Sequence, residues 1–131
     1  MTKDKIIETL AKDWHYHTIA IWRRARYKCE YCGKSMIANP DDYFFDAHLD
    51  HIVPGLGNDM NNYALSCKAC NFIKRAIDHR LANQPNTREA LIARAAKRIA
   101  DTRERNKGRL TDDLDLLKQL DEMDGLEPVI D

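Results

Sequence analysis

Four cysteines stand in two matched pairs, and these pairs constrain the fold more than any other feature of the sequence. The pairs are Cys29-Glu-Tyr-Cys32 and Cys67-Lys-Ala-Cys70, and 34 residues separate them. A Cys-x-x-Cys turn offers two thiolates to one ion with little strain, so two such turns supply the four ligands of a tetrahedral zinc site. The sequence therefore predicts a four-cysteine zinc clamp. Four thiolates leave no open coordination position, so we expect this zinc to be structural.

Two disulfides are the alternative use of the same cysteines. Disulfides persist in oxidising compartments, whereas cytoplasmic thiols stay reduced. The start of the chain, residues 1–13, mixes Lys, Asp and Glu and lacks the apolar stretch of a signal peptide. The mean hydropathy is −0.62, and no apolar run approaches the length needed to cross a bilayer. We therefore expect a cytoplasmic protein with no membrane partner, in which metal binding is favoured over disulfides.

The length of the chain, 131 residues, predicts a single α+β domain that is mostly helical. We expect residues 1–28 to form N-terminal helices, residues 29–83 the zinc-clamped core, and residues 87–124 a helical extension. Within the core, residues 43–53 are predicted to be extended, because alternate positions share a chemical character there.

Helical periodicity begins where the second cysteine pair ends. Ile73, Ile77 and Leu81 recur at i, i+4 and i+8, which predicts that they are buried on one face of a helix. Asn71 and Lys74 fall on roughly the opposite face. The first turns of this helix are therefore expected to present polar side chains beside the cysteines.

The C-terminal region is predicted to be an antiparallel helical hairpin. Residues 88–106 are amphipathic, and Lys107-Gly108 has the cation and glycine of a helix end. Thr111 would then cap a final helix. That helix carries an apolar stripe, which we expect to serve a possible homodimer as well; its members are Leu114, Leu117, Leu120 and Met123.

The net charge is zero, yet the charges are strongly segregated along the chain. Residues 1–67 carry 8 basic and 9 acidic residues, residues 68–109 carry 12 basic and 4 acidic, and residues 110–131 carry 1 basic and 8 acidic. The middle segment is thus net +8, which is sufficient to attract a polyanion locally. A solvated helix face explains the same basic residues equally well.

Hard oxygen ligands and a histidine lie close to the cysteine pairs in the sequence. His51 can take a proton near neutral pH, and Asp50 beside it suits Mg²⁺ or Mn²⁺. Asn71 offers a second oxygen from the following helix, and Lys74 could neutralise a phosphate oxygen one turn later. Together these side chains have the chemistry needed to hydrolyse a phosphodiester. His48 shares the face of Asp50 but has no assigned role.

Taken together, these residues closely resemble the HNH endonuclease family over about residues 29–75. The resemblance is to the zinc-containing subgroup with two Cys-x-x-Cys pairs. It implies a ββα-metal (His-Me finger) fold, in which two strands and a helix hold one catalytic divalent metal. The residues that carry it are Cys29-x-x-Cys32, Leu49-Asp50-His51-Ile52-Val53-Pro54, Asn62, and Leu65-Ser66-Cys67-x-x-Cys70-Asn71-x-x-Lys74.

The resemblance implies a role for each matching residue. His51 corresponds to the general base, and Asp50 and Asn71 to the ligands of the catalytic Mg²⁺ or Mn²⁺. Asn62 corresponds to the middle Asn, which orients the loop and the histidine, although Asn61 is its neighbour. Asn71 stands where the family has its final His, so this chain is of an H-N-N type. The implied activity is DNA hydrolysis that leaves a 5′-phosphate and a 3′-hydroxyl.

The basic segment supplies the candidate nucleic-acid contacts. The alternative function is a non-catalytic, zinc-stabilised nucleic-acid-binding module, which would need the cysteines and the basic residues only. A protein-interaction adaptor that uses the acidic C-terminal helix is a third possibility. The candidate DNA contacts are Lys74, Arg75, Arg94, Lys97, Arg98 and Arg105.

Overall fold

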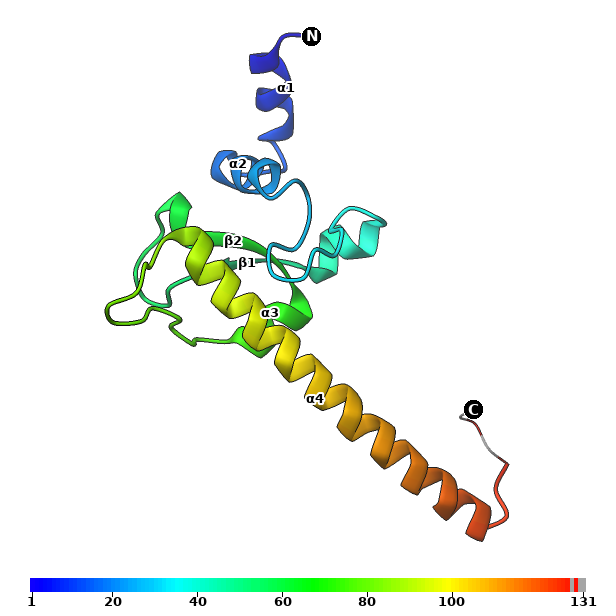
Figure 1. Cartoon of the computed structure of the whole chain (residues 1–131). Coiled ribbons are helices and arrows are strands. Elements are labelled where there is room, and N and C mark those ends of the chain that lie inside the picture. Colours follow the sequence, from blue (N-terminus) through cyan, green and yellow to red (C-terminus); the bar gives the residue numbers. More distant parts are fainter. Residues whose placement is uncertain (128, 130–131) are drawn as a thin grey trace. The chain divides into compact units, whose positions relative to one another are not determined.

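The computed structural model describes residues 1–127 and 129, and the chain divides into two compact units, residues 1–99 and 100–131. The first unit contains the N-terminal helices, a two-stranded sheet and a short helix (Figure 1). The second unit contains the later part of the last helix. No helix in the described part of the chain is both long and apolar enough to cross a membrane.

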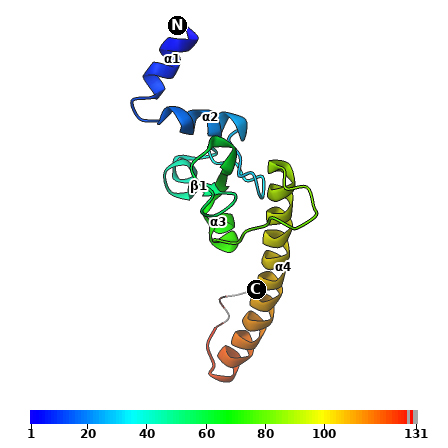
Figure 2. The same cartoon turned by 90° about the vertical axis from the view of Figure 1, so that its left-hand side faces the viewer.

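The two strands and the helix that follows them form a ββα unit, which Figure 2 shows from a second direction. The strands are antiparallel, with Ala47 opposite Cys67 at one end and His51 opposite Tyr63 at the other. This confirms the predicted, mostly helical α+β fold. The elements are α1 (Lys3–Leu10), α2 (Tyr16–Arg24), a π-helical turn η1 (Asp42–Asp46), β1 (Ala47–His51), a 3-10 turn η2 (Met60–Asn62), β2 (Tyr63–Cys67), α3 (Lys68–Lys74) and α4 (Arg88–Met123).

The hydrophobic core of the first unit lies around the hairpin. Side chains from α2, from both strands, from the segment after β1 and from the start of α4 meet there. Each fully buried aliphatic or aromatic side chain stabilises the fold by about 1.5–3 kcal/mol relative to its exposed state. The core includes Ile21, Trp22, Met36, Ile52, Val53, Leu65, Leu91, Ala95 and Ile99.

The first cysteine pair lies in a tight turn, as its sequence predicts. The backbone N–H of Cys29 donates to the carbonyl of Lys34 at 2.8 Å, and the N–H of Gly33 donates to the carbonyl of Cys29 at 2.8 Å. Gly33 has a φ of +79°, a conformation that costs a residue with a Cβ about 1–2 kcal/mol. Glycine at this position therefore lets the turn close around the two sulfurs.

The prediction that residues 43–53 are extended is wrong for the first part of this segment. Residues up to Asp46 form the turn η1, and β1 begins only at Ala47. Asp46 forms an ion pair with Lys34, and its carboxylate also accepts a hydrogen bond of 2.9 Å from the backbone N–H of Lys68. These contacts from distant parts of the chain hold the turn, and the alternation of residues 43–53 does not reveal them.

The helix predicted to bury Ile73, Ile77 and Leu81 is much shorter in the structure. α3 ends at Lys74, Arg75 has a φ of +51°, and Leu81 is 51% exposed. Asn86 and Arg94, which lie later in the chain, hold the following loop. Asn86 exchanges two hydrogen bonds of 3.0 Å with the backbone of Leu81, and Arg94 donates to the carbonyl of His79 at 3.0 Å. Tertiary contacts thus override the local periodicity.

The predicted C-terminal hairpin is also wrong, because α4 runs without a break from Arg88 to Met123. Gly108 has no positive φ, and a glycine inside a helix costs only about 1 kcal/mol relative to alanine. Thr111 does not act as a cap: its hydroxyl donates to the carbonyl of Lys107 at 2.9 Å, a bond found within a continuous helix. A glycine without a nearby proline is therefore too weak a signal to end this helix.

Candidate active site

The four cysteines come together as predicted. Their Sγ atoms all lie within 4.8 Å of one another, and the sulfurs of Cys32 and Cys67 are 3.8 Å apart. Four sulfurs around one zinc at about 2.3 Å lie roughly 3.8 Å apart, so the cluster suits a structural zinc. All four thiols are free, which is contrary to the disulfide alternative.

Cys67 links the cysteine cluster to the helix of the ββα unit. It is the last residue of β2 and the N-cap of α3, and its sulfur accepts a hydrogen bond of 3.4 Å from the backbone N–H of Cys70. Hydrogen bonds from neighbouring thiols, that of Cys29 first, lower the pKa of the Cys67 thiol. The same contacts raise the pKa of the Cys29 and Cys70 thiols, so without an ion the cluster favours a thiolate at Cys67 and protonated partners around it.

Asp50 lies on β1 with its carboxylate buried and paired. Its Oδ2 atom accepts a hydrogen bond of 2.5 Å from the Tyr31 hydroxyl and lies 3.1 Å from Nζ of Lys74. Burial, and then the negative charge of Asp50, raise the pKa of Tyr31, so this hydroxyl stays protonated and donates. Oδ1 of Asp50 has no hydrogen bond to any of the residues described, which leaves one carboxylate oxygen available.

His51 follows Asp50 and is held by two neighbours. Its Nε2 atom lies 2.9 Å from Oδ1 of Asn58, which also accepts a hydrogen bond of 3.0 Å from the Tyr63 hydroxyl. The ring of Tyr63 packs against the imidazole at a centroid distance of 4.7 Å. Because an amide oxygen only accepts, Nε2 carries the proton in this pair, and Nδ1 of the neutral ring keeps its lone pair.

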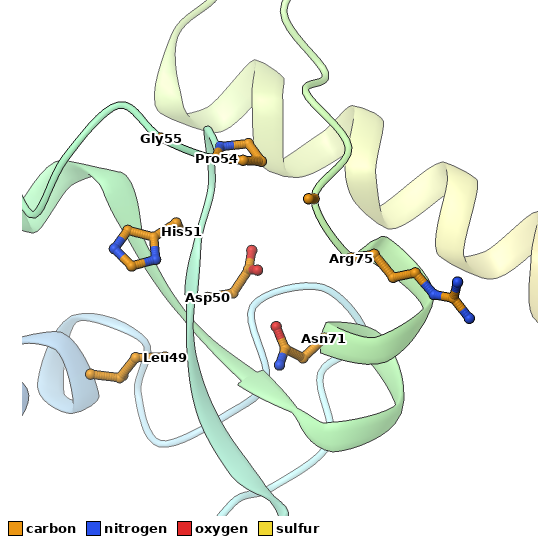
Figure 3. A pocket seen from close by; sticks show the side chains of 8 residues that line it. Leu49, Asp50, His51, Pro54, Gly55, Asn71 and Arg75 are labelled. Carbon is orange, nitrogen blue, oxygen red and sulfur yellow. The ribbon is translucent and has the colours of Figure 1, made fainter.

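Asp50, His51 and Asn71 share one pocket of about 260 Å³. Asp50 and His51 come from the end of β1, whereas Asn71 comes from α3 directly after Cys70. Figure 3 shows the carboxylate of Asp50 between the imidazole of His51 and the amide of Asn71. The pocket thus combines a proton acceptor with two kinds of oxygen ligand. It is completed by Leu49, Pro54, Gly55, Arg75 and Ala76.

Comparison with protein-family models identifies the segment that carries this pocket. Residues 29–76 match the model described as HNH endonuclease, which spans both cysteine pairs, the hairpin and α3. This segment is an HNH endonuclease domain. Comparisons of the chain with curated proteins and with solved structures found no match.

Asn62 of the HNH domain braces the loop between the strands. Its Oδ1 atom accepts a hydrogen bond of 2.8 Å from the N–H of Val53, and its Nδ2 donates at 3.0 Å to the carbonyls of Val53 and Gly57. Asn62 is buried, whereas the neighbouring Asn61 is exposed. Asn62 therefore fixes the loop that follows His51 and carries Asn58.

Lys74 is placed differently from the sequence-based expectation that it meets a phosphate. Its side chain is fully buried, and Nζ donates to the carbonyl of His51 at 3.0 Å as well as pairing with Asp50. An ammonium that makes these contacts inside the protein is not available at the surface. Lys74 instead connects α3 to both polar residues at the end of β1.

The other five predicted DNA contacts differ in their exposure and in the unit to which they belong. Arg75 lines the pocket and is exposed, with its guanidinium 4.5 Å from the centre of the Phe72 ring. Lys97 and Arg98 are exposed on α4. Arg94, by contrast, is half-buried and donates to the loop before α4. Arg105 belongs to the second unit, where it donates to the Thr102 hydroxyl at 3.3 Å.

Two residues that contact the site have no recognisable sequence signal. Tyr31 is an unremarked residue inside the first Cys-x-x-Cys turn, yet its hydroxyl contacts Asp50, which lies 19 residues later. Asn58 lies in a Gly-rich loop, and an asparagine in such a loop is ordinarily interpreted as a turn residue. Both contacts depend on how the chain returns to β1, so spacing alone does not predict them.

Proposed function

We propose that the HNH domain hydrolyses phosphodiester bonds in DNA, with His51 as general base and one Mg²⁺ or Mn²⁺ ion on Asp50 and Asn71. The observation that supports this most directly is the shared pocket of these three side chains, which come from β1 and α3. A base and hard oxygen ligands in one pocket are what hydrolysis of a phosphodiester requires.

In this proposal His51 removes a proton from the attacking water. Nδ1 is the nitrogen with a free lone pair, because Nε2 donates to Asn58. Asn58 and Tyr63 then hold the imidazole in one orientation, and Asn62 holds the loop that carries Asn58. Removal of the proton makes the water a better nucleophile toward the phosphorus.

The oxygens of Asp50 and Asn71 suit a hard divalent cation. When bound, such an ion supplies a Lewis acid that stabilises negative charge on the phosphate and on the leaving 3′ oxygen. Tyr31 and Lys74 both contact Oδ2 of Asp50, so they orient the carboxylate and leave Oδ1 without a hydrogen bond to the described residues. Two protein ligands are few, which is usual for Mg²⁺ sites that are completed by water and phosphate oxygens.

The four cysteines would hold a zinc ion that has no part in the chemistry. Zinc there would join the turn at residues 29–33 to the junction of β2 and α3. Asn71 follows Cys70 directly, and Tyr31 lies inside the first cysteine pair. The clamp therefore positions a ligand on one side of Asp50 and a hydrogen-bond donor on another.

DNA is the proposed partner, and exposed cations would provide the contacts with its backbone. Arg75 at the pocket and Lys97 and Arg98 on α4 are the exposed candidates in the first unit. Phosphate contacts of this kind give affinity without sequence preference. The chemistry of cleavage thus resides in the pocket, and the basic residues hold the strand near it.

A second copy of the chain is the other proposed partner, through the later part of α4. Leu110 and Leu117 are 58% and 49% exposed and share one stripe of the helix with Leu114. Residues 103–109 contain four basic residues, and residues 112–122 contain five acidic residues. Two such helices in antiparallel orientation would pair their leucines and place each basic segment beside the acidic segment of the other.

The chemistry of the cut ends tests the proposed reaction. Zinc-loaded protein is incubated with supercoiled plasmid DNA with added Mg²⁺ or Mn²⁺, and the nicked product is treated with DNA ligase. We expect direct resealing, because the reaction leaves a 5′-phosphate and a 3′-hydroxyl. Phosphatase treatment before ligation is the control and should prevent resealing. Nicks that reseal only after end repair would contradict the proposed mechanism.

A further inference from the structure

A second cavity, of about 290 Å³, adjoins the candidate active pocket. Leu49 of β1 lines both cavities, so the two cavities meet at this residue. The second cavity lies between α2, the turn η1 and the hairpin. It is small for a drug-sized ligand and suits a single planar ring system. The residues around it are Thr18, Trp22, Tyr43, Phe44, Ala47, His48, Leu49 and Leu65.

Aromatic rings form one side of this cavity. The ring of Tyr43 lies 5.3 Å from that of Trp22 and 4.8 Å from that of Phe44. Trp22 is buried in the core, whereas Phe44 is 70% exposed. The three rings thus extend from the buried Trp22 to the exposed Phe44, and a flat ligand can stack on the ring of Phe44. Phe44 makes little use of its apolar surface within the fold.

Two polar side chains complete the lining. Nδ1 of His48 lies 2.9 Å from the carbonyl oxygen of Asp46, so in the neutral ring Nδ1 carries the proton and Nε2 is an acceptor. The hydroxyl of Thr18 has no hydrogen bond to another residue in the described ranges and is able to donate or accept. Aromatic faces with one or two hydrogen-bonding groups are the features that proteins use to bind unstacked bases.

We propose that this cavity binds a nucleobase of the strand that is cut, adjacent to the phosphate at His51 and Asp50. The proposal rests on the nuclease function proposed above and specifies its substrate. A base can enter only if it has left the duplex stack, which costs a few kcal/mol in paired DNA and little in single-stranded DNA. The enzyme therefore prefers unpaired or easily opened DNA, and Phe44 and His48 contribute to that preference.

Phe44 and its neighbour Phe45 allow a matched test. Phe45 is 73% exposed and does not line the cavity, so both alanine variants should fold and load zinc equally well. Affinity for a fluorescein-labelled single-stranded oligonucleotide is measured by anisotropy with the zinc-loaded full chain, without added Mg²⁺ or Mn²⁺. Because a base stacked on an aromatic ring accounts for about tenfold in affinity, Phe44→Ala should weaken binding about tenfold. Phe45→Ala should change affinity less than twofold, and Phe44→Trp should retain it.

A second arm locates the base. Single abasic sites are placed at successive positions of the same oligonucleotide. We expect one position to weaken binding by the wild-type chain about tenfold and to have no further effect on Phe44→Ala, because the stacking contact is already lost. The proposal would be overturned if Phe44→Ala and Phe45→Ala changed the affinity for the oligonucleotide equally. It would also be overturned if the abasic site weakened binding by the wild-type chain and by Phe44→Ala to the same extent.

The two proposals fail in different experiments. If the wild-type chain cleaves DNA but the phenylalanine variants bind alike, the base site is wrong and the nuclease function stands. If Phe44→Ala and the abasic site are coupled but no divalent metal supports cleavage, the base site stands and the nuclease function is wrong. The binding arm needs no turnover, so its result does not depend on activity.

Discussion

At the scale of single residues, the site depends on contacts that join α3 to the end of β1. Lys74 is fully buried, and it pairs with the carboxylate of Asp50 and donates to the carbonyl of His51. One ammonium thus fixes the two residues that we propose as ligand and base. Removing one partner of a buried ion pair leaves the other charge without compensation, which is costly.

Lys74→Met tests this positioning role. The substitution preserves much of the side-chain volume but removes the charge, so Asp50 keeps only the Tyr31 hydroxyl. We expect the free energy of unfolding of the zinc-loaded protein in urea to fall by about 3 kcal/mol. We also expect the affinity for Mn²⁺ to fall by about 10- to 100-fold, because a residue that orients a ligand has been lost.

Lys68→Met is the matched control, because Lys68 is on the same helix but exposed. Its effect on the free energy of unfolding should be within about 0.5 kcal/mol. If both variants lose the same stability, or if Lys74→Met binds Mn²⁺ as the wild type does, Lys74 has no positioning role.

The sequence predicts the candidate site in part. It does not predict residues whose role depends on contacts that form only in the folded chain. Asp50, His51 and Asn71 are proposed from the chemistry of their side chains beside the cysteines, and Asn62 is proposed from the resemblance of this segment to HNH endonucleases. Tyr31 and Asn58 are not identifiable from the sequence, since their roles arise only after the chain has folded back. The sequence places Lys74 beside the site but does not predict that its side chain is buried. A lysine is rarely fully buried, and its partner Asp50 lies 24 residues earlier in the chain.

At the scale of elements, the cysteine turn and the ββα unit are predicted well, and helix lengths are not. The turn follows from residues that are close in sequence, with Gly33 supplying the required φ. The end of α3 and the loop after it depend instead on Asn86 and Arg94, which contact Leu81 and His79 from later in the chain. Helix ends set by distant residues cannot be read from a local pattern.

Gly108→Ala tests whether α4 is continuous. An added Cβ at Gly108 has no heavy atom within 4 Å, and alanine is favoured over glycine in a helix interior by about 1 kcal/mol. We therefore expect the variant to keep or increase the helical signal at 222 nm and to melt at a higher temperature. A helix end with a left-handed glycine would predict the opposite, a loss of signal and a lower melting temperature.

Gly33→Ala is the control for backbone conformation. A Cβ there also meets nothing within 4 Å, but the φ of +79° is unfavourable for alanine. Its unfolding free energy should fall by about 1 kcal/mol, so the two glycine substitutions should act in opposite directions. If both substitutions lowered the unfolding free energy, glycine would be required at position 108 and the continuous helix would be contradicted.

At the scale of the whole molecule, a net charge of zero results from opposite charges in separate segments. The basic residues 68–109 and the acidic residues 110–131 lie next to each other in the sequence, and α4 contains parts of both. This arrangement suits attraction between an antiparallel pair of chains and repulsion between a parallel pair. The total charge alone would have excluded neither DNA nor a second copy as a partner.

Charge reversal tests the proposed antiparallel pair. With Leu114 at the centre, Lys107 of one copy lies opposite Asp121 of the other, because each is seven residues from the centre. Lys107→Glu and Asp121→Lys should each weaken dimerisation about tenfold in sedimentation equilibrium at low salt. Mixing the two variants should restore a heterodimer, since each new charge then faces its opposite. A monomeric wild-type chain, or no recovery on mixing, would contradict the antiparallel pair.

The most direct test of the central claim is cleavage of supercoiled plasmid by the zinc-loaded protein, with Mg²⁺ or Mn²⁺ and with a chelator. Wild type is compared with His51→Ala and with His17→Ala, an exposed histidine on α2 that serves as the control. The account predicts metal-dependent nicking or linearisation that is lost in His51→Ala, with zinc content unchanged, and is retained in His17→Ala. Full activity of His51→Ala, or DNA binding by the wild-type chain without cleavage in any metal, would contradict it.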